Sequence, residues 1–145
     1  MKYCLKYTNI CTKLNHADEI SIKYIEDRGL VDFMEKFSSQ RIILRVDPAD
    51  FSHNEVRKLI AIRKQYPEYR FTVGLAYADP TLIPWFQQEN IPFYIAAPCK
   101  SWEEFHWLMK QGVSDVDISG PLAFEIGNVN RVLNSLGRKV VVRAT

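Results

Sequence analysis

Alternating apolar and polar residues predict six short β-strands along the chain. In each segment every second residue is large and apolar, which is the period of a strand that buries one face. The segments are residues 19–24 (EISIKY), 41–47 (RIILRVD), 69–77 (YRFTVGLAY), 92–97 (PFYIAA), 114–119 (SDVDIS) and 139–145 (KVVVRAT). The intervals between them leave room for one short helix after each strand.

Helical periodicity fills these intervals. An apolar stripe at the i, i+3, i+4, i+7 spacing covers residues 30–37, and similar stripes begin at Val56 and Trp102. Residues 52–55 (SHNE) and 101–104 (SWEE) match the capping box, in which a serine and a glutamate satisfy backbone amides at the start of a helix. Gly112 and Gly137 are placed to end helices. Pro84 predicts that the third helix is short, kinked or late to begin.

The alternation of strands and helices predicts an α/β fold with a parallel sheet. One face of the strands is uniformly large and apolar, whereas the other is small, polar or charged, so helices are expected on one face only. This is the pattern of a (β/α) barrel, but a complete barrel has about 250 residues and this chain has 145. We therefore expect a single domain, residues 1–145, with an incomplete or small TIM-barrel-like sheet and helices on its outer face. Residues 1–7 would add a strand or close the bottom of the sheet.

Composition narrows the classes of function. Hydrophobic residues make up 47% and charged residues 25%, as in ordinary globular proteins. The net charge is +2 without a run of Lys and Arg, which argues against nucleic acid as a partner. The three cysteines form no CxxC pair, and no signal peptide or membrane span is visible, so a cytoplasmic protein is expected. Neither a cofactor motif nor a histidine at metal-ligand spacing occurs, so we expect no cofactor and no metal.

Residues 111–126 (QGVSDVDISGPLAFEI) end a helix on glycine, pass through a strand and begin the next helix after a loop. This segment resembles a unit of TIM-barrel proteins, loosely the barrel of the collagenase-like peptidase family. It is also similar to uncharacterised barrel-like proteins of phages and mobile elements of Gram-positive bacteria. The resemblance implies the fold class alone, because no catalytic residue of the peptidase family matches a position here and a fold does not define a function.

Charged residues gather near the carboxyl ends of the predicted strands, where the sites of such folds lie. They are Lys23, Arg45, Asp47, Asp117 and Arg143. If the sheet curves, these residues converge, and three cations with two carboxylates are suited to hold and orient an anionic ligand. The alternative interpretation is a structural ion-pair network in a polar interior.

Three further features each have a functional and a structural interpretation. Cys99 precedes a predicted helix and Lys100, which makes it a candidate reactive thiol, but no histidine is placed beside it and a packed thiol is the alternative. Asp47 and Asp50 have the spacing of cation ligands, although Asp-Pro is first a turn signal. Trp85 and Trp107 do not both fit the buried stripes, so we expect one or both to be exposed. An exposed tryptophan is a candidate interface anchor, and packing within the protein is the alternative interpretation.

Two classes of function are consistent with the sequence. The first is a binding or interaction module of the incomplete (β/α)-barrel type that forms a homodimer or other homo-oligomer, or binds a protein partner, because an unclosed sheet has edge strands that proteins tend to cover. The alternative is a small enzyme that acts on an anionic small molecule at the carboxyl ends of the strands. We favour the first, because the chain is short for a closed barrel and has no recognisable catalytic constellation.

Overall fold

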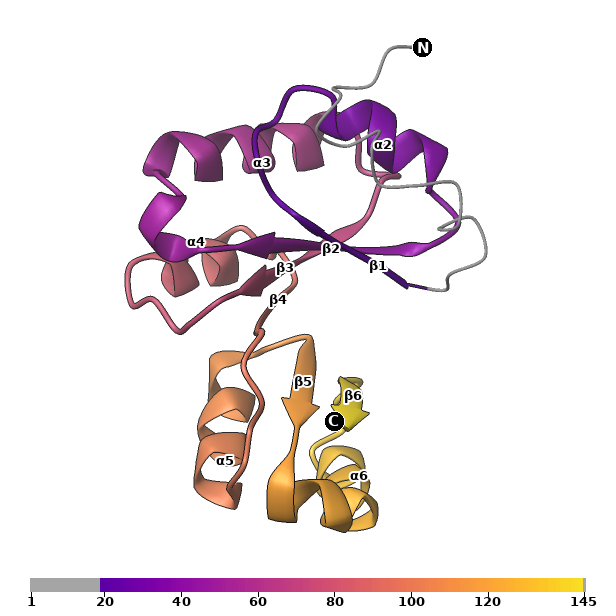
Figure 1. Cartoon of the computed structure of the whole chain (residues 1–145), viewed down its shortest axis with the longest axis vertical. Coiled ribbons are helices and arrows are strands. Elements are labelled where there is room, and N and C mark those ends of the chain that lie inside the picture. The colour runs from indigo at the N-terminus through magenta and orange to yellow at the C-terminus, as the bar shows by residue number, and fades with distance from the viewer. Residues whose placement is uncertain (1–18, 145) are drawn as a thin grey trace. The chain divides into compact units, whose positions relative to one another are not determined.

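The computed structural model of the chain describes residues 19–144 (Figure 1). The fold divides into two compact units, with the boundary between Gly74 and Leu75. The boundary falls inside a strand rather than in a linker rich in glycine or proline.

The first unit is a parallel sheet with two helices. Its strands β1 (Glu19–Lys23), β2 (Arg41–Val46) and β3 (Phe71–Leu75) are adjacent in that order. Strands β1 and β2 pair in parallel from Glu19 opposite Arg41 to Lys23 opposite Arg45. Helices α2 (Leu30–Lys36) and α3 (His53–Gln65) lie on one side of these strands (Figure 1), and a short 3-10 helix, η2 (Pro48–Asp50), precedes α3.

The core of the first unit consists of the apolar face that the alternation predicts. The fully buried residues of β1 and β2 on this face are Ile20, Ile22, Ile42 and Leu44, and those of the helices include Leu30, Phe33, Val56 and Leu59. Burial of such a side chain stabilises the fold by about 1.5–3 kcal/mol. Helices on one side of the sheet therefore supply the cover that the apolar face requires.

The second unit also combines short strands with helices. Its strands are β4 (Phe93–Ile95), β5 (Asp115–Ile118) and β6 (Val141–Ala144), and its helices are α4 (Leu82–Gln88), α5 (Trp102–Gln111) and α6 (Ile126–Ser135) with the 3-10 helix η3 (Gly120–Glu125) before α6. Strands β5 and β6 form a parallel pair. The chain after β4 runs beside β5, because Cys99 N donates to Asp117 O at 2.6 Å and Ser119 N donates to Cys99 O at 3.0 Å.

All six predicted strands and the parallel α/β class are confirmed between residues 19 and 144. The barrel-like arrangement is not part of this confirmation, because neither sheet closes within these residues. The strand expected in residues 1–7 lies outside the described residues. Helix α4 is short, as Pro84 predicts, and Gly112 adopts φ +78° where α5 ends.

The two predicted capping boxes have different outcomes. At α5 the prediction is confirmed, because Ser101 Oγ accepts from Glu104 N at 3.2 Å. At α3 it is wrong, because Ser52 makes no capping hydrogen bond through its side chain. Glu55 instead accepts a hydrogen bond of 2.5 Å from the hydroxyl of Tyr24 and lies 3.4 Å from Lys58 Nζ. Tyr24, the residue after the end of β1, therefore binds the glutamate that the capping box would have used.

This difference predicts unequal effects of two serine substitutions. We expect Ser101→Ala to lower the free energy of unfolding by about 1 kcal/mol, the usual effect of removing a side-chain cap. Ser52→Ala is the matched control and should change it by less than about 0.5 kcal/mol. Urea denaturation of the two variants measures both values, and equal losses would contradict the assignment.

Candidate functional site

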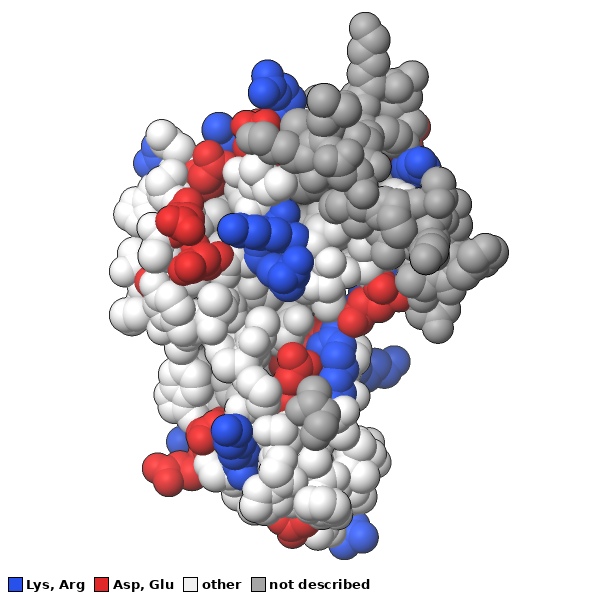
Figure 2. Space-filling model, in the orientation of Figure 1, with Lys and Arg blue, Asp and Glu red and all other residues white. Residues whose placement is uncertain are grey.

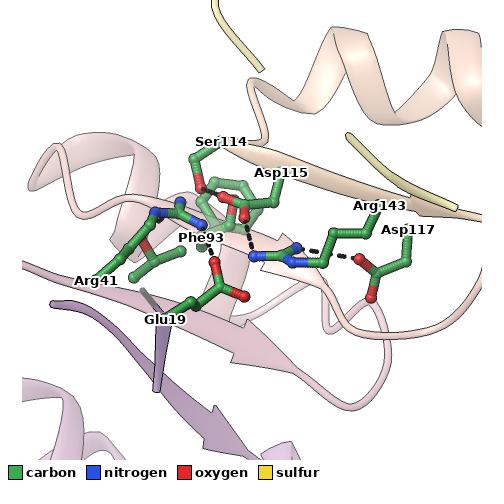
Figure 3. Close-up of polar contacts among 8 residues, drawn as sticks. Glu19, Arg41, Phe93, Ser114, Asp115, Asp117 and Arg143 are labelled. Carbon is green, nitrogen blue, oxygen red and sulfur yellow. Dashed lines mark hydrogen bonds and ion pairs between the residues drawn. The ribbon is translucent and has the colours of Figure 1, made fainter. Parts of the chain in front are cut away.

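Asp115, Asp117 and Arg143 form a cluster on the two paired strands of the second unit (Figure 3). Asp117 and Arg143 lie opposite each other in β5 and β6, and Arg143 Nη1 is 3.1 Å from Asp117 Oδ1. Arg143 Nη2 is 2.6 Å from Asp115 Oδ2. One guanidinium thus bridges two carboxylates that would otherwise repel each other.

Asp115 is the most deeply buried member of this cluster, with a side chain that is 0% exposed. Its second oxygen accepts from Ser114 Oγ at 2.8 Å, and the guanidinium of Arg143 also lies 5.2 Å from the centre of the Tyr94 ring. A buried carboxylate needs such partners, because desolvation of an unpaired charge is very costly. For Asp117 and Arg143 the geometry therefore favours the ion-pair network over a ligand site.

Asp115 was not among the predicted site residues. The alternation placed it on the same polar face as Asp117, and nothing local in SDVDIS distinguishes the two aspartates. Their difference is burial, since the side chain of Asp117 is 19% exposed.

Lys23 and Arg45, two other predicted site residues, lie together on the first unit. They are opposite each other in β1 and β2, and both are exposed. At the other end of the same two strands, Glu19 and Arg41 are also opposite each other, but they form an ion pair of 2.9 Å (Figure 3). The structure thus brings Lys23 together with Arg45, and Asp117 together with Arg143, each pair within its own unit.

Asp47, the fifth predicted charged residue, caps a short helix. Its Oδ1 accepts from Ala49 N at 3.0 Å at the start of η2, while Asp50 is exposed. This favours the turn over the cation site as the role of this segment. In residues 19–144 no group of three or more His, Cys, Asp and Glu side chains is arranged to hold a metal ion.

Cys99 is buried, with 1% of its surface exposed. Burial raises the pKa of this thiol above its ordinary value, and the negative charge of Glu104 raises it further, whereas the hydrogen bond to the Ser101 carbonyl opposes them. The thiol donates that bond over a sulfur–oxygen distance of 3.4 Å. Of the two interpretations that the sequence leaves open, the structure favours the packed thiol.

A groove of about 570 Å³ lies beside helix α5, entirely within the second unit. Its apolar lining comes from the end of β4, the following loop and α5: Ile95, Ala97, Pro98, Trp107 and Leu108. Glu103 and Glu104 add two exposed carboxylates to the lining. Trp107 is 45% exposed, which confirms that one of the two tryptophans outside the buried stripes faces solvent.

Other large apolar side chains of the second unit are also exposed. Phe124 in η3 is the extreme case at 91%, and Leu136 at the end of α6 reaches 51%. The sequence did not predict the exposure of Phe124. A 3-10 helix repeats every three residues, so its exposed positions differ from those of an amphipathic α-helix. Neither residue lines the groove beside α5.

Comparison with known proteins gives no match: no family model fits the chain, and neither a curated protein nor a solved structure matches it. Within residues 19–144, none of the helices has the length and apolar composition needed to cross a bilayer.

Proposed function

We propose that this chain is a protein-interaction module of the incomplete (β/α)-barrel type, and that it binds a partner polypeptide in the groove beside α5. The observation that carries the proposal is Trp107, a large aromatic side chain left 45% exposed at the edge of an apolar groove. Tryptophan is enriched among the residues that dominate binding energy at protein interfaces, because it buries a large area at a small entropic cost.

The lining of the groove indicates what the partner presents. A volume of about 570 Å³ holds a few side chains, and its walls are apolar. The polar groups there are largely engaged, since Ser101 caps α5 and the Cys99 thiol is bonded to the Ser101 carbonyl. Glu103 and Glu104 lie beside the apolar wall. The complementary partner is therefore a segment with a large apolar side chain flanked by Lys or Arg.

Selection of a displayed library of random peptides against the whole chain tests this proposal. We expect enrichment of peptides that combine Leu or an aromatic residue with Lys or Arg. Trp107→Ala should weaken their binding by about thirtyfold, the effect of losing an interface residue worth about 2 kcal/mol. Phe124→Ala is the matched control, because it also truncates an exposed aromatic side chain but outside the groove, and should leave the affinity unchanged.

Two results would overturn the proposal: selection that enriches no such peptides, or peptides that bind Trp107→Ala as tightly as the unsubstituted chain. A second copy of the chain is the other protein partner that the sequence predicts. Sedimentation velocity distinguishes it, because a dimer that dissociates on Trp107→Ala would show that the groove is filled by self-association rather than by a foreign segment.

A further inference from the structure

The first unit carries two cations opposite each other in its parallel sheet. Lys23 is the last residue of β1, and Arg45, its partner in the register, is the penultimate residue of β2. Both side chains are exposed, and Lys and Arg side chains form a patch over these strands in Figure 2. Among residues 19–144, neither side chain has a hydrogen bond or ion pair with a carboxylate.

The same two strands carry a pair of opposite charges at another position of the same face. Four positions earlier on the same face, Glu19 lies opposite Arg41 and forms an ion pair of 2.9 Å. Opposite charges at facing positions stabilise a sheet, whereas like charges there destabilise it. The Lys23–Arg45 pair is therefore unfavourable for folding taken alone, and an anion between the two side chains would turn the repulsion into attraction.

The chemistry of the pair selects the anion. Arginine presents a planar fork of N–H groups that matches a phosphate group, and lysine adds a compact positive charge. Ser21, exposed two residues before Lys23 on the same face of β1, adds a hydroxyl donor. These groups lie toward the carboxyl ends of parallel strands, where α/β proteins bind ligands.

The surrounding charges limit the size of the ligand. Glu19 places a carboxylate at the far end of the same face, so the basic surface does not extend along the strands as a track for a polyanion. We propose that Lys23 and Arg45, with Ser21, bind a single phosphate group, either free phosphate or the phosphomonoester of a small molecule. This site is independent of the groove beside α5.

Titration of the whole chain with inorganic phosphate and, separately, with glycerol phosphate tests the proposal at constant ionic strength, with amide and arginine side-chain NMR signals as the readout. We expect saturable shifts confined to Ser21, Lys23, Arg45 and their neighbours. Tighter binding of glycerol phosphate would identify a phosphomonoester as the ligand, and tighter binding of inorganic phosphate would identify the free ion.

Variants separate this site from nonspecific attraction. Arg45→Gln should weaken phosphate binding by about tenfold, the effect of losing one charge-assisted hydrogen bond. Arg57→Gln is the matched control, because it removes an exposed arginine of α3 in the same unit and should leave the affinity unchanged. Asp47→Asn should strengthen binding by about twofold, because it removes a nearby negative charge but keeps an acceptor for the Ala49 amide.

Arg45→Glu distinguishes a loss of phosphate binding from a loss of folding. It replaces two like charges by an opposite pair, so the melting temperature should be unchanged or higher while phosphate binding is lost. The proposal is overturned if Arg45→Gln binds phosphate as the unsubstituted chain does, or if Arg57→Gln weakens binding equally.

Discussion

Replacing Arg143 by methionine should lower the free energy of unfolding by about 3 kcal/mol, because the change removes a cation that is paired with the buried carboxylate of Asp115. Asp115 has a side chain that is 0% exposed and lies 2.6 Å from Arg143. The expected loss stands at the lower end of the range for a broken buried pair, because 25% of the Arg143 side chain is in contact with solvent. Urea or thermal denaturation measures the loss.

Two further variants make this prediction specific. Arg28→Met is the matched control, since Arg28 and Glu26 are 3.5 Å apart with the arginine side chain 80% exposed, and it should lower the free energy of unfolding by less than about 1 kcal/mol. Adding Asp115→Leu to Arg143→Met should recover part of the lost stability, because it removes the buried negative charge that Arg143 balances. Equal losses for Arg143→Met and Arg28→Met would show that the buried pair is not an important source of stability.

The regular elements could be predicted because their determinants are local. A strand with one buried face repeats every second residue, and this period is visible in EISIKY and RIILRVD without knowledge of the neighbouring strands. The parallel pairing follows from the helix that connects each strand to the next. How many strands join one sheet depends on contacts between distant segments. The alternating pattern of each strand therefore does not determine whether the strands form a barrel-like sheet.

Which residues on the polar face of the strands are buried could not be predicted from the local sequence. Ile43 and Thr72 belong to this face by alternation, and both are buried together with Asp115. Lys23 and Arg45 belong to the same face and are exposed. The alternation assigns a residue to a face, but the depth at each position of that face depends on what the folded chain places over it.

In the candidate sites, too, some features could be predicted from the local sequence and others depend on distant or irregular segments. Exposure of a tryptophan could be predicted, because Trp107 does not belong to the stripe that begins at Trp102 and Phe105. The groove beside Trp107 could not, since its other wall is the irregular segment after β4, including Ala97 and Pro98, whose path no periodicity describes. Likewise SHNE and SWEE are equivalent as sequences, and only Tyr24, which lies 31 positions from Glu55, makes them different.

Alkylation of Cys99 should be on the order of a hundredfold slower in the folded protein than in urea, because a thiol that is 1% exposed reacts only when the surrounding structure opens. The measurement uses iodoacetamide and a chain in which Cys4 and Cys11 are replaced by serine, so that Cys99 is the only thiol. The pH dependence adds a second readout. Since burial raises the pKa of Cys99, its reaction should accelerate at a higher pH than that of an exposed thiol.

The matched control moves the thiol by one residue. Cys99→Ser with Lys100→Cys places an exposed cysteine before the same helix, and we expect it to react at nearly the rate of the unfolded chain. Rapid alkylation of folded Cys99 near neutral pH would contradict the assignment of a packed thiol and favour a reactive one.

The raised pKa of Cys99 also has a consequence for stability. The protonated thiol is favoured in the folded state, so the contribution of Cys99 to the free energy of unfolding is complete below the ordinary pKa of 9.0. This contribution is lost as the pH rises through the raised pKa.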